Sequence, residues 1–212
     1  MTTVIDLEGV LLGSDLPVQA YARHATEHLD PAAATAVIDG MRDFLEGKGT
    51  GLAGALGVDL TGVEDGTEAV TLLARAAGVP DPALAGAHIA AQRDLLASLF
   101  VLDPSPALAA LPAGEPVWVV SELPPADAAQ VVGALDDTGR TERIVTFGEL
   151  TAAPPAGTWT MVAHCWEGEL DRAAALGART AHLDRFGTGT GSPTWRARTL
   201  PDLLAAMAGG AS

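Results

Sequence analysis

The chain has 212 residues, of which 48% are apolar and only 4% aromatic, so it can bury a sizeable core built from aliphatic side chains. A formal net charge of −15 makes nucleic acids and anionic membranes unfavourable partners, and no apolar run is long enough to span a bilayer. A single cysteine, Cys165, excludes an intramolecular disulfide and a cysteine-rich zinc site. The N-terminus has no basic region followed by an apolar stretch, and we therefore expect a cytoplasmic protein.

The first predicted element is a short buried strand. Residues 3–5 form an apolar run that leads directly into Asp6, Glu8 and the turn residue Gly9. An apolar run that ends at a glycine turn is typical of a buried strand. The ordinary interpretation of Asp6 is a turn or N-cap residue, and the alternative is a catalytic acid.

A block of helices follows, from residue 16 to about residue 101. The pairs Asp30-Pro31 and Asp81-Pro82 each combine an N-cap residue with a proline at the first helical position. A shorter helix between these two is predicted over residues 68–77, where it ends at Gly78 and Pro80. The block therefore holds about four helices.

Strands and helices alternate in the rest of the chain. The predicted strands cover residues 116–120, 143–146, 159–163 and 179–183, and the predicted helices cover residues 127–135, 169–176 and 200–207. This alternation predicts an α/β fold with a Rossmann-like, doubly wound parallel sheet. The expected domains are an α/β core of residues 1–13 and 104–212 and a helical cap of residues 15–103, inserted after the first strand.

Several chemically active side chains follow directly after the predicted strands. In a doubly wound sheet, ligands bind beyond the carboxyl ends of the strands. The residues expected there are Asp6, Glu8, Ser121, Glu122 and His164. Because three of these carry carboxyl groups, crowding predicts a raised pKa for at least one of them.

The motifs at these positions resemble those of the haloacid dehalogenase (HAD) superfamily, the HAD-like hydrolases. Val4-Ile5-Asp6-Leu7-Glu8-Gly9-Val10-Leu11 is similar to the first motif, and Val117-Trp118-Val119-Val120-Ser121 is similar to the second. The segment 162–177 is similar to the last motif. The resemblance implies an α/β core with an inserted cap, a nucleophilic role for Asp6 and an acid/base role for Glu8. From their places at the strand ends we also expect Ser121, Glu122 and His164 to bind the substrate.

The sequence departs from this family pattern at three positions. Glu8 replaces the second aspartate of the first motif and is one methylene longer. The lysine of the third motif aligns with Ala153, and the chain's one lysine, Lys48, lies in the predicted cap. The magnesium-binding aspartate of the last motif aligns with His164, and the acid after it with Glu169. Imidazole is a poor ligand for Mg²⁺. We therefore expect no metal ion or other cofactor, and we do not expect magnesium-dependent phosphatase activity.

Three functional hypotheses follow, and all involve a small-molecule ligand. The first is a HAD-like protein with a degenerate active site that acts in natural-product biosynthesis or with a partner, either a second copy or a paralogous HAD-like subunit. The second is an enzyme that catalyses elimination or ring closure, such as aziridine formation, on a small amine-bearing metabolite. The third is a HAD-family hydrolase of altered metal preference.

Overall fold

The structure is a computed structural model that describes residues 1–48, 54–99, 102, 105–111 and 114–210. The chain forms two compact units, one of Met1–Gly13 with Leu99–Ser212 and one of Ser14–Ser98. The first unit carries the sheet, and the second is helical. Among the described residues, no helix has the length and apolar character needed to cross a membrane.

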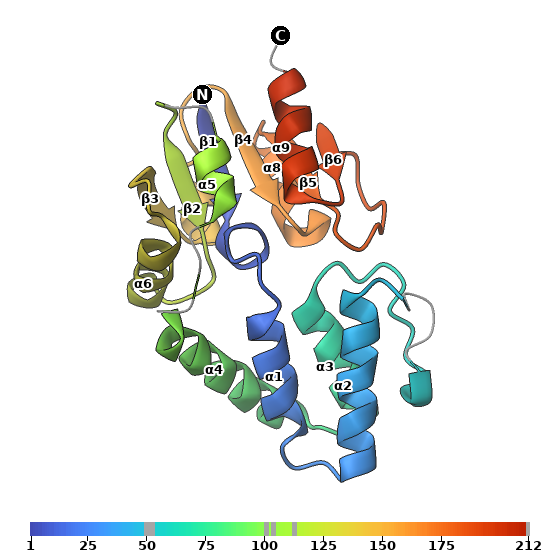
Figure 1. Ribbon diagram of the computed structural model, residues 1–212. Helices are drawn as coiled ribbons and strands as arrows, with labels where there is room; N and C mark the ends of the chain where they lie inside the picture. Colours follow the sequence, from blue (N-terminus) through green and yellow to red (C-terminus); the bar gives the residue numbers. More distant parts are fainter. Residues whose placement is uncertain (49–53, 100–101, 103–104, 112–113, 211–212) are drawn as a thin grey trace. The chain divides into compact units, whose positions relative to one another are not determined.

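The described part of the first unit contains a six-stranded parallel sheet in the order β3-β2-β1-β4-β5-β6 (Figure 1). Its strands are β1 (Thr2–Asp6), β2 (Val117–Val120), β3 (Thr141–Val145), β4 (Trp159–Ala163), β5 (Arg179–Leu183) and β6 (Trp195–Ala197). The first strand lies in the middle, where Ile5 is paired with Val119 on one side and Val162 on the other. The strand order reverses between β1 and β4, which is the switch point of a doubly wound sheet. The predicted fold class is therefore confirmed.

Helices cover the sheet and provide the core. They are α5 (Pro106–Ala110), α6 (Pro125–Leu135), α7 (Phe147–Ala152), α8 (Asp171–Ala175) and α9 (Leu200–Gly209), with two π-helical turns, η1 (Leu7–Leu11) and η4 (Trp166–Leu170). Helices α5 and α9 contact each other on the face of the sheet that Figure 1 turns toward the viewer. A buried cluster joins Phe147 and Leu150 of α7 to Val4 and Met161 of the sheet. The packing of α7 on the sheet thus helps to hold in place the strands whose carboxyl ends carry the predicted site.

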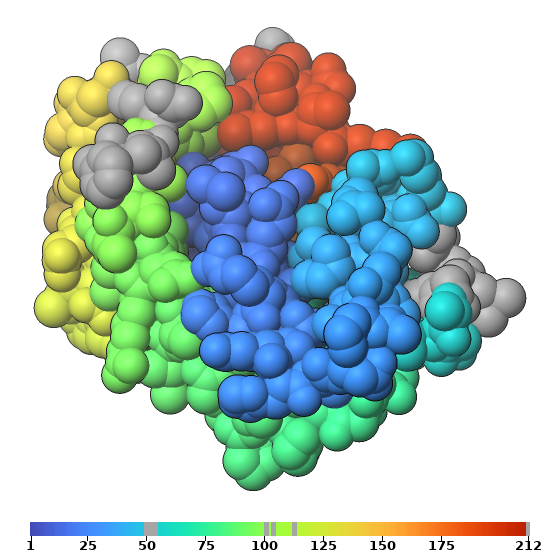
Figure 2. Space-filling view, turned by 60° about the horizontal axis from the view of Figure 1, so that its bottom comes forward, coloured from blue at the N-terminus to red at the C-terminus, as the bar shows by residue number. Residues whose placement is uncertain are grey.

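The second unit is built from α1 (Leu16–Thr26), α2 (Pro31–Leu45), α3 (Gly66–Ala76) and α4 (Asp81–Ala97), with a 3₁₀ turn, η2 (Gly54–Leu56). Figure 2 shows α1 and α2 side by side, and buried Phe44 and Leu73 lie on the adjoining helices α2 and α3. Asp30 caps α2 as predicted, since its carboxylate accepts the N–H groups of Ala32 and Ala33.

The predicted cap at Asp81 is wrong by one residue. Helix α4 begins at Asp81 itself, after Pro80, and no side chain caps it. The Asp81 carboxylate is instead 2.8 Å from Nε of Arg75, near the end of the preceding helix. An acid in the first helical turn still interacts favourably with the helix dipole.

Both edges of the sheet carry an arginine stacked on a tryptophan of the neighbouring strand. The Arg143 guanidinium of β3 lies 4.3 Å from the ring centre of Trp118 on β2. On the opposite edge, Arg179 of β5 lies 4.1 Å from the ring centre of Trp195 on β6. Strand β6 was not predicted, because its three residues form no apolar run of their own.

Candidate active site

Asp6 stands at the carboxyl end of the central strand. It is the last residue of β1 and only 4% exposed, and its Oδ2 accepts the N–H of Gly9 at 2.9 Å. This hydrogen bond makes Asp6 the N-cap of the π-helical turn η1. The structural and the catalytic interpretations of Asp6 are therefore compatible, since only one of its two oxygens is needed for the cap.

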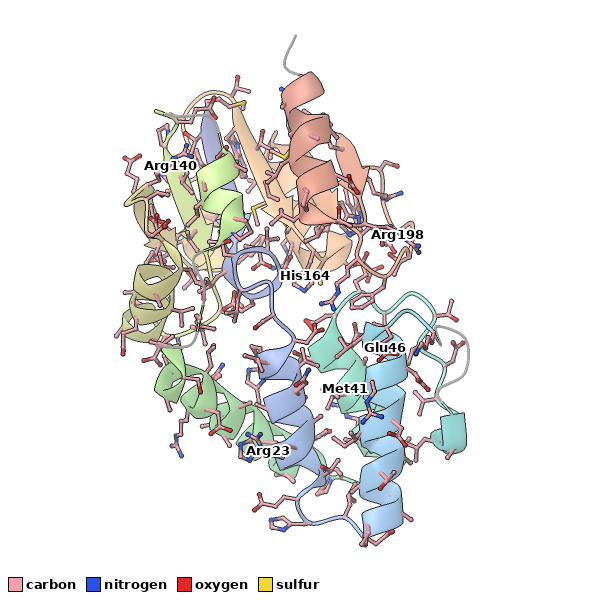
Figure 3. The ribbon with its side chains drawn as sticks, in the orientation of Figure 1. Arg23, Met41, Glu46, Arg140, His164 and Arg198 are labelled. Carbon is pink, nitrogen blue, oxygen red and sulfur yellow. The ribbon has the colours of Figure 1, made fainter. Side chains whose placement is uncertain are left out.

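His164 meets Asp6 from the neighbouring strand. It follows directly after β4, and its Nδ1 lies 2.9 Å from Asp6 Oδ2. Figure 3 shows His164 at the end of the sheet where β1 and β4 terminate. The imidazole ring lies against the backbone of Gly9, in space that a larger residue at position 9 would occupy. The switch point of the sheet thus holds an aspartate–histidine pair.

Glu8 is anchored to the end of β2. Its Oε1 accepts a hydrogen bond from Ser121 Oγ at 2.6 Å and another from the Glu122 N–H at 3.2 Å. The Ser121 hydroxyl oxygen in turn accepts the N–H of Leu123 at 3.0 Å. Ser121 therefore connects the Glu8 side chain to the backbone that follows β2.

The surroundings of Glu8 raise the pKa of its carboxyl group from 4.5 to about 7. The largest cause is burial, which disfavours the charged form, and the second is the negative charge of Asp6. The hydrogen bonds from Ser121 and Glu122 act in the opposite direction but are outweighed. The Glu8 carboxyl group can therefore both lose and gain a proton near neutral pH.

A third carboxylate lies beside the aspartate–histidine pair. Glu169 Oε2 is 4.0 Å from His164 Nδ1 and accepts the Cys165 N–H at 3.4 Å. One donor atom from each of Asp6, His164 and Glu169 lies within 4.8 Å of the other two. Within the described part of this unit, these three residues form a group that could hold a metal ion.

This donor set does not fit the magnesium ion that the family motifs imply. Mg²⁺ prefers an octahedron of oxygen atoms, and here the side chain nearest to Asp6 presents a ring nitrogen. The lysine of the family pattern is missing too: Ala153 follows α7 directly, and Lys48, in the other unit, is paired with Glu46.

The structure brings most of the predicted site residues together. Asp6 contacts His164, and Glu8 contacts Ser121. Glu122 joins them through its backbone N–H, whereas the residue itself is exposed. One residue that the sequence analysis missed is His182, a fully buried residue whose Nε2 lies 3.1 Å from the carbonyl oxygen of His164. The sequence feature that could have indicated His182 is a titratable side chain within a predicted strand, since residues 179–183 were expected to form one.

Two solved structures are similar to this chain over nearly its whole length. The L-2-haloacid dehalogenase from Xanthobacter autotrophicus has a TM-score of 0.52 and 18% sequence identity, with 98% of each chain covered. The L-2-haloacid dehalogenase RSc1362 has a TM-score of 0.53 and 19% identity, with 96% of each chain covered. No protein-family model matches the sequence, and the search of curated proteins gave no significant match.

These similarities and the sheet order define the class: the chain has an α/β fold of Rossmann type with the architecture of the HAD-like hydrolases. The two solved structures named above are both L-2-haloacid dehalogenases. The predicted resemblance to the haloacid dehalogenase superfamily is therefore confirmed at the level of the fold. Sequence identities of 18% and 19% carry no information about the substrate of this chain.

Proposed function

We propose that this chain is a small-molecule enzyme that uses the haloacid dehalogenase fold without magnesium, with Asp6 and Glu8 as an acid–base pair. The observation that carries this proposal is the different setting of two neighbouring acids: Glu8 is held by Ser121 and the Glu122 N–H, and Asp6 by Gly9 and His164. Burial and the charge of Asp6 raise the pKa of Glu8 to about 7. Two titratable groups with different surroundings commonly take the acid and the base role in one reaction. A group with a pKa near the working pH can both release and accept a proton efficiently.

The proposed roles follow from the contacts of each residue. Asp6 accepts the Gly9 N–H, and its Oδ2 lies 2.9 Å from His164 Nδ1, so its carboxyl group is held in place at the end of β1. The raised pKa of Glu8 lets its carboxyl group carry a proton near neutral pH. Asp6 is therefore the base that takes a proton from the substrate, and protonated Glu8 is the acid that delivers one to the leaving group.

The proposed substrate is a small compound that carries an ammonium group and a leaving group. In ring closure, Asp6 takes a proton from the ammonium nitrogen, and the freed electron pair forms a nitrogen–carbon bond. The bond from carbon to the leaving group breaks, and that group departs with its electron pair and with the proton of Glu8. Asp6 then returns its proton to solvent and Glu8 regains one. Acidic side chains at Asp6, Glu8 and Glu169 favour a cationic ligand.

The test compares two ligands of matched size, ethylamine and ethyl phosphate, by calorimetric titration at pH 7. We expect ethylamine to bind more tightly, and Asp6→Asn to weaken its binding at least tenfold. Asp137→Asn is the control, because Asp137 is an exposed acid of the same unit. Tighter binding of ethyl phosphate would contradict the proposal.

A second measurement addresses the reaction itself. With 2-chloroethylamine as a probe, we expect chloride release faster than in buffer alone, unchanged by added chelator and lost in Asp6→Asn. The hydrolase alternative predicts something different, namely phosphate release from a generic ester that depends on added metal and on Asp6. That second result would replace the acid–base proposal by a hydrolase of altered metal preference.

A further inference from the structure

The cluster of Asp6, His164 and Glu169 has the dimensions of a metal site, but a short contact of hydrogen-bond length already joins two of its members, Asp6 and His164. The His164 Nδ1 lies 2.9 Å from Asp6 Oδ2, which is a normal length for an N–H···O hydrogen bond, and 4.0 Å from Glu169 Oε2. We propose that the Nδ1–H of His164 takes the place of a metal ion as the group that holds the Asp6 carboxylate. His164 is then a positioning residue for Asp6.

Contacts with Gly9 and His182 help to hold His164 in this position. On one side, the ring packs on Gly9, the residue whose N–H also binds Asp6 Oδ2. On the other side, the fully buried His182 lies 3.1 Å from the backbone carbonyl of His164 through its Nε2, which donates the hydrogen bond. The His164 side chain itself is only 16% exposed. One contact thus holds the backbone of His164 and the other packs against its ring. A residue that positions another side chain needs such support.

The same arrangement excludes an ion from the pair. A metal ion coordinated by Nδ1 would have to displace the proton that forms the hydrogen bond to Asp6. The ion would also need Glu169, whose Oε2 accepts the Cys165 N–H. A carboxylate at position 164 would favour metal binding, because positions 6, 164 and 169 would then offer only oxygen atoms as ligands.

This inference deepens the proposed function, since an active site without a metal needs another group to orient Asp6. Its test does not depend on amine binding or on turnover, so the two proposals fail separately. The measurement is calorimetric titration of the chelator-treated protein with Mg²⁺ and with Mn²⁺. For the wild type we expect no saturable binding at millimolar concentrations of either ion.

Three variants make the test specific. His164→Asp should gain binding of both ions, by at least tenfold relative to the wild type, together with a rise in melting temperature when the ion is added. The double variant with Glu169→Gln should lose this gain. His164→Asn should remain without metal binding, because the amide N–H of asparagine can replace Nδ1–H as a donor to Asp6.

A second measurement needs no variant. The nitrogen chemical shifts of the imidazole in the chelator-treated wild type report which ring nitrogen carries the proton, and we expect a protonated Nδ1. Wild-type binding of Mn²⁺ that His164→Asn abolishes would overturn the inference, and so would an Nδ1 without a proton. A folded His164→Asp variant that gains no metal binding would overturn it as well.

Discussion

The imidazole of His164 occupies the space in which residue 9 would carry its side chain: a Cβ on Gly9 would come within 1.7 Å of His164 Nδ1. Separations below 3.0 Å do not occur for real Cβ atoms, so one of the two groups would have to move. Because Gly9 also donates its N–H to Asp6, a shift of this turn disturbs both partners of the aspartate–histidine pair. Glycine is therefore needed at position 9 for packing, whatever its backbone angles.

Gly9→Ala should therefore destabilise the protein by about 1–3 kcal/mol, the range for overpacking a filled site. The matched control is Gly13→Ala, where the nearest atom to a new Cβ is 3.9 Å away and the expected change is within about 0.5 kcal/mol. Urea unfolding of both variants measures the difference. Equal effects of the two substitutions would show that the close approach to His164 is unimportant.

The raised pKa of Glu8 predicts a pH-dependent stability. Glutamate titrates at 4.5 in the unfolded chain and at about 7 in the folded protein. Between these values the folded state keeps a proton that the unfolded state has released, so the stability contributed by Glu8 falls as pH rises through this window. The total loss is at most about 3.5 kcal/mol, since one pKa unit corresponds to about 1.4 kcal/mol.

Glu8→Gln removes this titration but keeps an oxygen that accepts from Ser121 and Glu122. We expect the variant to gain stability relative to the wild type when the pH is raised from 5 to 8. Unfolding midpoints at the two pH values give the measurement, with Glu27→Gln, at an exposed residue of the helical unit, as the control. A constant difference between variant and wild type would count against a raised pKa of Glu8.

Ser121→Ala tests the link between Glu8 and β2. The serine hydroxyl lowers the pKa of Glu8 by hydrogen bonding to the carboxylate, so its removal should raise that pKa above 7. The variant also loses the acceptor of the Leu123 N–H, and a cost in stability of about 1 kcal/mol is expected. Carbon-detected NMR titration of the glutamate carboxyl groups measures the pKa, with Ser14→Ala as the exposed control. An unchanged or lower pKa would contradict the assigned hydrogen bond.

The glycine-rich segment after β5 offers a comparison of two glycines with the same backbone angle. Gly189 and Gly191 both have φ of 72°, but only at Gly191 would a Cβ meet a side chain, the Trp166 indole at 1.9 Å. Alanine at either position should cost about 1 kcal/mol for the left-handed backbone. Gly191→Ala should cost at least a further 1 kcal/mol for the clash, measured as a larger drop in melting temperature. If Gly189→Ala lowered the melting temperature as much as Gly191→Ala, the close approach of Trp166 would not contribute to stability.

The site was predictable because the central strands that carry it are mostly apolar runs, each followed by a polar residue. Val117–Val120 followed by Ser121, and Trp159–Ala163 followed by His164, are such runs, and parallel pairing brings their carboxyl ends to one edge. The convergence of Asp6, Ser121 and His164 required no information beyond this rule. The fold class followed for the same reason.

Contacts that depend on tertiary geometry were not predictable. The pairing of His164 with Asp6 depends on the space above Gly9, and nothing in the spacing of 158 residues between them indicates which atoms meet. The hydrogen bond from His182 to the His164 carbonyl likewise arises only when β4 and β5 are paired. Strand β6 has only three residues and exists because β5 provides a partner for it.

The arginine–tryptophan stacks at the two margins of the sheet also affect how this protein behaves in a crowded solution. The edge strand of a sheet has unpaired N–H and C=O groups that can bind another extended chain. Proteins prevent such pairing with charged side chains and with short edge strands. Here β3 exposes Glu142 and Arg143, and β6 is three residues long with Arg196 at its centre. A second molecule that extended the sheet would have to desolvate these charges. Stable self-association of this chain should therefore use helical surfaces, and the protein should resist fibril formation at high concentration.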